Sequence, residues 1–423
     1  MRTGRSRWVA LFATLALTAS ACGEDGDSQE GGSGGGDGGG EPITVGSTLS
    51  LSGALGPTGE IHEVAGKLFV ERLNNGGGLL DRPVRWRLLD DKSDTAAVSG
   101  LYERLITEDS VDLIMGPYAT PNIVASMAVA ERQSYTLPQH TGVLVYALTY
   151  PCQFPAWSLG PDPGVDVPTM VFDMLEEQGE LPESIAFVTN QAGSTDFISH
   201  GQPGGEGGSA IEVARERGIE VALDVSYAPD TTDWGPIAAR VRDADPDFLW
   251  ISGLALDSTN LIEAMKQLRY DPPQMFDLFP APGPLLGAGK DADGMLAVSL
   301  FEPNKAALDR LGEEATEISE SFTAAAEKAG LGYPVFETQA AASWTAWEML
   351  VQGVEGAGSL EQQEICDHLA ENGADTTFFG HIDFDADANN FYRNQGGLKQ
   401  IQEGEWVTVW PADKSSAEYV APK

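Results

Sequence analysis

The chain has 423 residues, of which 64 are acidic and 25 basic, and its formal net charge is −39. A surface of this sign repels nucleic acid and anionic lipid headgroups, so the composition excludes both as partners. The acidic residues are spread along the whole chain, which is typical of a solvated surface. The length is enough for two domains, or one large one, with an ample core.

The N-terminus has the pattern of a secretory signal followed by a tether. Three arginines precede the apolar run 8–17, which is too short and wrongly flanked for a membrane span. Residues 1–21 are therefore predicted to be a signal peptide. Residues 22–41 are almost entirely Gly, Ser, Asp and Glu, a composition that cannot bury a core. The arrangement resembles a bacterial lipoprotein signal with lipid on Cys22, and ordinary cleavage after Ala21 is the alternative.

The first part of the remaining chain alternates between two kinds of segment. Short apolar runs predict strands at 43–49, 84–89 and 111–115. Amphipathic runs predict helices at 59–74 and 121–132, with another between the second and third strands. Short strands separated by helices indicate a parallel sheet covered on both faces.

Five prolines between residues 142 and 168 are expected to interrupt any regular element there. A second alternating series follows, and the chain closes with a predicted hairpin. The fold class is therefore α/β, with two doubly wound parallel-sheet lobes joined through a proline-rich crossing. The segments of this second part are strands at 185–189, 221–227 and 248–251, helices at 209–217, 236–243, 306–329 and 338–353, and hairpin strands at 397–401 and 406–410.

No motif for catalysis or for a structural metal is present in the sequence. The five histidines lack metal-binding spacing, there is no Gly-x-Ser-x-Gly, and neither an enzyme nor a cofactor is predicted. Asp383, Asp385 and Asp387 have the spacing that begins a calcium loop, but its Gly and Glu are missing. A turn stabilised by Asx side chains is the simpler interpretation, and cation binding stays open. Cys152 and Cys366 belong to an oxidising compartment, and the sequence leaves their pairing open.

One loop has the chemistry of a ligand site. Tyr118, Ala119 and Thr120 follow an apolar strand and open a helix, where free backbone amides and the Thr120 hydroxyl could hold a carboxylate. The alternative is that Thr120, predicted at the cap position, only caps its own helix. The segment after the next strand would present three polar residues to the same crevice: Gln139, His140 and Thr141.

The residues around these segments resemble the leucine/isoleucine/valine-type substrate-binding proteins of ABC importers. The resemblance extends from residue 41 to residue 411 and is carried by segments 43–53, 65–66, 73–77, 89–93, 115–117, 231–234 and 247–253. It implies a type I periplasmic-binding-protein fold with three crossings and a ligand cleft between the lobes. The liganded protein would dock on a membrane permease driven by a separate ATPase.

The resemblance also assigns roles by position. Thr120 matches a hydroxyl that binds the carboxylate of an amino acid, and Gln139 and Thr141 match positions that hold its carboxylate and ammonium. On the second lobe the cleft residues would be Leu254, where the family has tyrosine, Phe279 and Ala281. The acidic residue expected near 279–281 is absent, and Asp257 or Glu206 could replace it. His140 favours a polar or anionic ligand, with a structural histidine as the alternative.

These observations predict an extracytoplasmic solute-binding protein, anchored by lipid on Cys22, that delivers its ligand to an ABC permease. The ligand is an amino acid, an amide, or an aromatic or other organic acid, and the protein is a monomer. A sensor of the same fold and a secreted hydrolase are the alternatives. The predicted lobes are residues 42–160 plus 299–393, and residues 161–298 plus 394–423.

Overall fold

The computed structural model describes residues 40–204, 208–272, 274–393 and 396–421. The predicted signal peptide, Cys22, nearly all of the predicted tether and Glu206 lie outside the described residues. Within the described ranges, no helix combines the length and the hydropathy that a bilayer crossing requires.

The first sheet has three parallel strands with β1 (Ile43–Leu49) in the middle. β1 is buried along almost its whole length, as expected for a strand covered on both faces. Its neighbours are β2 (Val84–Asp90) and β3 (Leu113–Ile114), and β3 is shorter than the predicted strand because it pairs with two residues of β1. A separate parallel pair consists of β4 (Leu137–Gln139) and β5 (Gln153–Pro155).

Helices α1 (Gly56–Asn75), α2 (Thr95–Thr107) and α3 (Thr120–Gln133) follow the strands of the first sheet. α2 begins where the Asp94 carboxylate accepts the Ala96 amide at 3.0 Å, which satisfies one of the free amides of the first turn. α1 and α3 each have a proline in the first turn, where the missing N–H has no cost. Two separate hydrophobic clusters form, one including α1 and the other α2 and α3.

The second sheet has seven strands in the order β14-β13-β10-β9-β8-β6-β7. β6 to β10 are parallel, whereas β13 and β14 form an antiparallel hairpin beside β10, which confirms the predicted hairpin. The strands are β6 (Ser184–Asn190), β7 (Glu220–Tyr227), β8 (Phe248–Ala255), β9 (Gln274–Pro280), β10 (Leu296–Ser299), β13 (Gly397–Gln402) and β14 (Glu405–Trp410).

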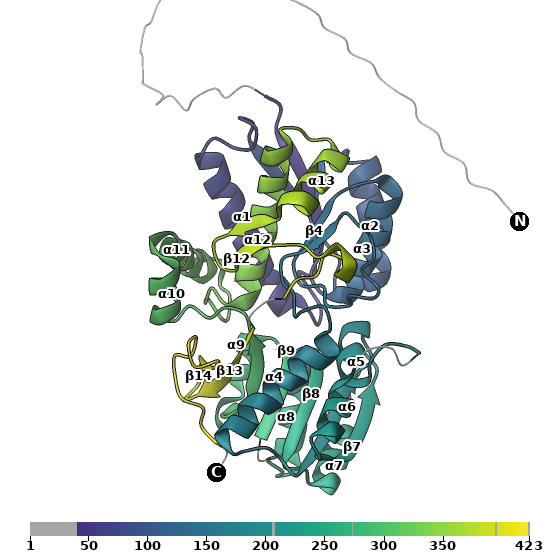
Figure 1. The fold of residues 1–423 in the computed structure, drawn as a ribbon, viewed down its shortest axis with the longest axis vertical. Helices are drawn as coiled ribbons and strands as arrows, with labels where there is room; N and C mark the ends of the chain where they lie inside the picture. The colour runs from purple at the N-terminus through teal and green to yellow at the C-terminus, as the bar shows by residue number, and fades with distance from the viewer. Residues whose placement is uncertain (1–39, 205–207, 273, 394–395, 422–423) are drawn as a thin grey trace, which may run out of the picture. The chain divides into compact units, whose positions relative to one another are not determined.

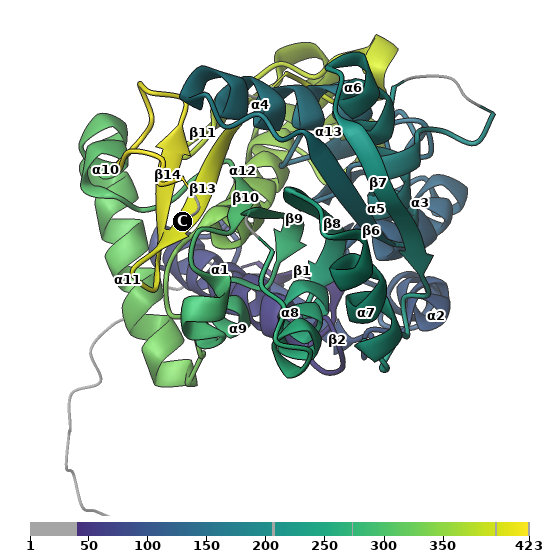
Figure 2. The same ribbon diagram turned by 90° about the horizontal axis from the view of Figure 1, so that it is seen from below.

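Helices cover both faces of the seven-stranded sheet. Figure 2 shows α4 (Pro163–Gln178) and α6 (Ala210–Glu216) on one face, and α7 (Gly235–Ala244) and α8 (Asp257–Gln267) on the other. Each face has its own hydrophobic cluster, as the doubly wound prediction requires. The remaining elements of this region are α5 (Gly193–His200), α9 (Pro282–Gly287) and the 3₁₀ turn η1 (Gly289–Ala292).

After β10 the chain returns to the first sheet. α12 (Thr338–Ala357) lies beside α1, so segments almost 300 residues apart share one core (Figure 1). The other elements of this part are α10 (Lys305–Leu311), α11 (Glu313–Ala329), α13 (Gln362–Asn372), β11 (Ala374–Thr376), β12 (Gly380–Ile382) and the 3₁₀ turn η2 (Ala386–Ala388).

Two predicted elements are wrong in the structure. The helix predicted over 306–329 is two helices, because Gly312 between them has φ +98°, a left-handed conformation that ends α10. The prolines of 142–168 also fail to exclude regular structure. β5 includes Pro155, and α4 begins at Pro163 and contains Pro168. Pro163 stands in the first turn, where the backbone amide has no partner within the helix. Pro168 lies further along α4 and removes one backbone hydrogen bond of the helix.

The structure also shows how the two cysteines after residue 150 and the acidic turn near residue 385 are arranged. Cys152, just before β5, and Cys366 of α13 form a disulfide. At Asp385 the carboxylate accepts the Asp387 amide at 3.0 Å, which is the Asx turn that the sequence favours.

Candidate functional site

A small cavity lies at the carboxyl ends of β3, β4, β5, β6, β8 and β9. In open α/β sheets this edge is where ligands bind. The free space is about 20 Å³, enough for about one water molecule, so the surrounding side chains nearly fill it. The walls come from both sheets and from α12: Tyr118, Ala119, Thr120, Thr141, Trp157, Ser194, Leu254, Phe279 and Gln339.

Most of the predicted ligand-binding residues are brought together here. The structure places six of them on the cavity walls: Tyr118, Ala119, Thr120, Thr141, Leu254 and Phe279. Gln139 and His140 are buried and do not line the cavity, and Ala281 lines a different pocket. Trp157, Ser194 and Gln339 were not foreseen from the sequence.

Thr120 is the first residue of α3, and Ala119 rather than Thr120 is the N-cap. The predicted cap position is therefore wrong by one residue. Ala119 has φ +71°, an unfavourable conformation for a residue with a Cβ, and such strain is concentrated at functional sites. The Thr120 hydroxyl accepts the Val143 amide at 3.1 Å. This hydroxyl thus fixes the loop after β4 against the start of α3, so its role is at least partly structural.

Gln139 stabilises the same loop after β4 through its side-chain amide. Its Oε1 accepts the Gly142 amide at 2.6 Å, and its Nε2 donates to Gln153 Oε1 at 3.3 Å. Both ends of the side chain amide are therefore used within the protein. Gln139 holds the loop in shape and does not reach the cavity.

Two buried histidines stack behind the cavity wall. The rings of His62 and His140 are 4.7 Å apart, and Tyr118 lies 5.0 Å from His62. Burial lowers the pKa of His62 to about 3, although its Nε2 contacts Gln339 Oε1 at 3.2 Å. Burial, and then His62, lower the pKa of His140 well below its usual value. Both rings are therefore uncharged at neutral pH.

Several polar atoms of the site have no hydrogen-bond partner among the described residues. They are the Thr141 hydroxyl, the Trp157 indole N–H, His62 Nδ1 and both ring nitrogens of His140. A buried polar group without a partner costs about 1–3 kcal/mol, and native proteins keep few of them. Two of them, the Thr141 hydroxyl and the Trp157 indole N–H, belong to wall residues of the cavity, where a ligand or water would supply the missing bonds.

Helix ends add to the polarity of the cavity. α3 begins at Thr120 on one wall, and α5 begins at Gly193, next to Ser194 on the opposite wall. The first amides of a helix are unpaired and carry partial positive charge, which favours an anion. The indole of Trp157 packs edge-to-face on Phe279 at 5.9 Å and gives this end of the site an apolar surface.

Two carboxyl groups lie behind the wall formed by Leu254. Asp257 Oδ2 accepts Asn190 Nδ2 at 2.7 Å, the Tyr227 hydroxyl at 2.9 Å and the Leu254 amide at 2.9 Å. Asp277 is fully buried, and burial raises its pKa to about 7, with the Ser258 hydroxyl opposing this shift. The Asp257 carboxylate is therefore built into the protein, and Asp277 is half protonated near neutral pH.

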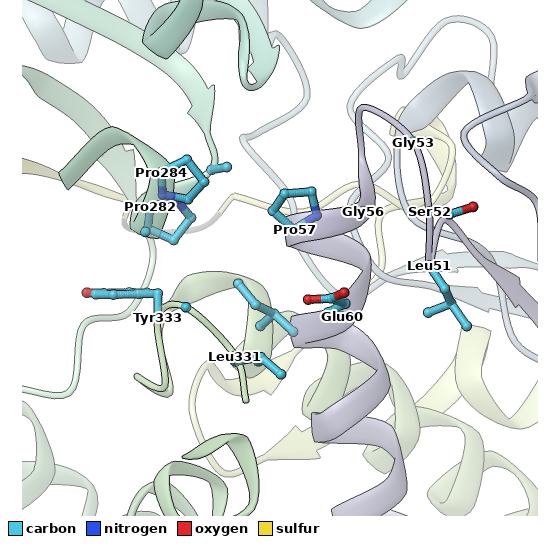
Figure 3. A pocket seen from close by; sticks show the side chains of 14 residues that line it. Leu51, Ser52, Gly53, Gly56, Pro57, Glu60, Pro282, Pro284, Leu331 and Tyr333 are labelled. Carbon is cyan, nitrogen blue, oxygen red and sulfur yellow. The ribbon is translucent and has the colours of Figure 1, made fainter. Parts of the chain in front are cut away.

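A second, larger pocket of about 360 Å³ contains Ala281. Figure 3 shows Pro57 and Glu60 of α1 facing Pro282, Pro284 and Tyr333 across it. Glu60 is the only charged side chain among its described lining residues. Ala281 therefore belongs to a separate space from the other predicted wall residues.

The walls could be found from the sequence only in part. Ser194 follows a strand and opens a helix, the same pattern that identified Thr120, so this signal was available. Trp157 lies in the proline-rich segment that was taken as irregular. Gln339 begins a helix some 200 residues after Thr120, and no local pattern connects it to the loops that it joins.

Comparison with known proteins gives one family. The model of the family described as periplasmic binding protein matches residues 42–400. Part of the chain is also similar to the chemotactic signal transduction system substrate-binding protein BasB from Halobacterium salinarum, with 33% identity over 106 residues. That match spans 24% of this chain and 26% of the length of BasB.

Solved structures with the same fold cover nearly the whole chain. The leucine binding protein LivK from Thermotoga maritima has a TM-score of 0.71 at 16% identity, with 86% of this chain and 97% of that chain covered. An ABC transporter solute binding protein from R. palustris, in complex with benzoate, has a TM-score of 0.71 at 19% identity and covers 90% and 98%. The transporter substrate binding protein LivJ from Streptococcus pneumoniae, in complex with isoleucine, has a TM-score of 0.68 at 17% identity and covers 90% and 100%.

At these identities the solved structures establish the fold alone, whereas the family model extends over the first sheet, the parallel strands of the second and every wall of the cavity. The chain therefore belongs to the periplasmic binding protein family and has its type I α/β fold.

Proposed function

We propose that the protein is an extracytoplasmic solute-binding protein that captures a small amino-acid-like or organic-acid ligand and delivers it to an ABC import permease. The observation that carries this proposal is the small cavity lined by residues of both sheets, where the Thr141 hydroxyl and the Trp157 indole N–H lack partners among the described residues. Residues 42–160 plus 299–393 would form one lobe, and residues 161–298 plus 394–423 the other. Closure of the lobes would bury the ligand.

The ligand is proposed to carry a carboxylate on a small apolar body. Free amides of α3 and α5, the Trp157 indole and the Thr141 hydroxyl are all hydrogen-bond donors. Phe279, Leu254 and Trp157 supply apolar contact. Isoleucine and benzoate, the ligands held by two structures of this fold, share that chemistry. An amino acid would place its ammonium toward the buried carboxylates behind Leu254, which an aromatic acid would not require.

The proposed protein is anchored to a membrane and catalyses no reaction. Cys22, at the predicted cleavage point, would carry lipid and hold the protein at the outer face of the cell membrane. Family members are solute-binding proteins, so we propose that this chain returns its ligand unchanged and acts as a monomer with a permease and its ATPase. Tethering raises the effective concentration of the receptor at the permease.

Thermal melting against a ligand panel tests the proposal. The panel contains leucine, isoleucine, their amides, benzoate and 3,4-dihydroxybenzoate. A ligand of the folded state must raise the melting temperature in proportion to ln(1 + [L]/Kd). We expect a rise with at least one carboxylate and none with its amide. A rise with the amides alone would contradict the carboxylate site, and chemical turnover of the bound compound would contradict the binding function.

Sensing is the second candidate, because part of the chain resembles a chemotactic substrate-binding protein. In that case the liganded protein would bind a membrane receptor instead of a permease. The neighbouring genes separate the two functions. Two permease genes and two ATPase genes favour import, whereas an adjacent transducer gene favours sensing.

A further inference from the structure

Lys399, Glu302 and Glu337 form a buried ion cluster outside the ligand cavity, called the Lys399 cluster here. Lys399 Nζ lies 2.5 Å from Glu302 Oε1 and 3.7 Å from Glu337 Oε2. The three side chains are only 5%, 3% and 2% exposed. Two carboxylates thus face one ammonium in a buried site, and buried charges are costly unless they are balanced.

The Lys399 cluster joins the two sheets. Lys399 is on β13, paired with Ala297 of β10, within the seven-stranded sheet. Glu302 follows β10, where the chain leaves that sheet. Glu337 is the N-cap of α12, which packs against α1 in the other core, and its Oε1 accepts the Gln339 amide at 2.9 Å. The cluster therefore connects the seven-stranded sheet to the helix that contributes Gln339 to the cavity.

The neighbouring groups are acidic or uncharged. Tyr333, on the segment before α12, has its pKa raised by burial and by Glu302, Glu337 and Glu405. Glu405 begins β14, and Glu337 also acts on Tyr118 of the cavity wall. The ring of Trp406 lies 4.7 Å from Lys399 Nζ and stabilises the ammonium. None of these groups supplies the missing positive charge.

With two carboxylates and one ammonium, the cluster has one negative charge in excess, which the binding of one proton would neutralise. Burial raises the pKa of Glu337 to about 7, with Lys399 opposing this shift and Glu302 adding to it. Burial also raises the pKa of Glu302, against the effect of Lys399. Burial lowers the pKa of Lys399, but the two carboxylates outweigh this and raise it overall. Near neutral pH the cluster holds an ammonium, a carboxylate and a carboxyl group that exchanges its proton.

We propose that the Lys399 cluster is a proton-linked brace: with one proton bound its charges balance and it holds α12 against the seven-stranded sheet, and without that proton the two lobes open. A raised carboxyl pKa means that the stabilisation is complete below the unfolded value of 4.5 and is lost as the pH rises through about 7. The closed arrangement is therefore favoured at lower pH. This inference uses the two lobes of the proposed function but needs no ligand, so a failed ligand panel leaves it intact.

Distances between spin labels on the two lobes test the brace. Labels at Lys67→Cys on α1 and Lys266→Cys on α8, both exposed positions, are attached to the full chain carrying Cys22→Ser. Double electron–electron resonance then gives the α1–α8 distance as a function of pH. We expect a longer distance above a midpoint near pH 7. In Glu337→Gln and Glu302→Gln, which each leave one carboxylate for Lys399, the distance should stay short at every pH.

Glu348→Gln is the matched control. Glu348 is also buried in α12 with a pKa raised by burial to about 7, but its carboxyl group accepts hydrogen bonds from Thr377 and Trp344, which both lie outside the seven-stranded sheet. This variant should open with pH as the wild type does. A pH-independent distance in the wild type, an unchanged transition in both cluster variants, or loss of the transition in Glu348→Gln each overturns the proposal. If one cluster variant fails to fold, as judged by circular dichroism, the other decides.

Discussion

The hydroxyls of Thr120 and Thr141 differ in what they do for the protein itself. Thr120 Oγ1 accepts the Val143 amide, whereas Thr141 Oγ1 has no partner among the described residues. Thr141→Val therefore removes an unsatisfied buried group, and we expect an equal or higher melting temperature without ligand. The rise caused by the carboxylate that binds in the panel should shrink. An unchanged rise would remove the Thr141 hydroxyl from the site.

Thr120→Val is the matched comparison for this prediction. It leaves the Val143 amide without its acceptor, which costs about 1–3 kcal/mol and should lower the melting temperature without ligand. If Thr120→Val and Thr141→Val melt alike, the hydroxyls are equivalent and the contrast drawn from the structure is wrong.

Single residues were predictable where one local rule identifies them. The rule that ligands bind beyond the carboxyl ends of parallel strands directed attention to Thr120 and Thr141, and both line the cavity. His140 follows β4 as Thr141 does, yet it lies behind the wall and stacks on His62 of α1. The rule does not predict this, because it depends on how α1 packs. Predicting Gln339 would have required knowing which helix packs against the first sheet.

At the scale of elements, the start of α3 combines backbone strain with a place on the cavity wall. Ala119 has φ +71° and ψ 135°, a sparsely populated conformation that costs a residue with a Cβ about 1–3 kcal/mol. Ala119→Gly should therefore raise or leave unchanged the free energy of unfolding, despite the greater freedom of glycine in the unfolded chain. Ala128→Gly, at an exposed position inside the same helix, should lower it by about 1 kcal/mol. Urea unfolding measures both, and equal losses would contradict the strain at Ala119.

Most helices and strands agree with the sequence pattern because both depend on local periodicity. The errors occur where one residue decides. Gly312 ends a run that is otherwise helical. The pattern of apolar residues does not predict its left-handed φ, because that pattern depends on side chains and glycine has none. Pro163 was counted as a breaker, although in the first turn of α4 a proline favours the helix.

At the scale of the whole molecule, two sets of buried groups make stability depend on pH in opposite directions. His62 and His140 have lowered pKa values, so their contribution is complete above pH 6.5 and is lost as the pH falls below it, toward 3 in the case of His62. Asp277 and Glu348 have pKa values raised by burial to about 7, so their contribution is complete at low pH and is lost as the pH rises through 7.

Two variants separate these sets. His140→Phe keeps an aromatic ring but cannot take up a proton in the unfolded chain. Relative to the wild type it should gain stability below pH 6.5, by up to about 1.4 kcal/mol per pH unit. Glu348→Gln resembles the protonated carboxyl group and should gain stability relative to the wild type as the pH rises toward 7. Urea unfolding near pH 5 and pH 8 measures both. Differences that are the same at the two pH values would contradict the assignment.

The placement of α12 beside α1 determines when the chain can complete its first core. The core around β1 and Phe69 is completed by Trp344 and Trp347, and Ser343 Oγ donates to the backbone carbonyl of His62 across 281 positions. Because a polypeptide is made from its N-terminus, α1 is synthesised long before α12. Until α12 emerges, the apolar side of α1 has no covering layer, and such surface invites aggregation. The core around β1 therefore stays incomplete, and open to aggregation, until most of the polypeptide has been made.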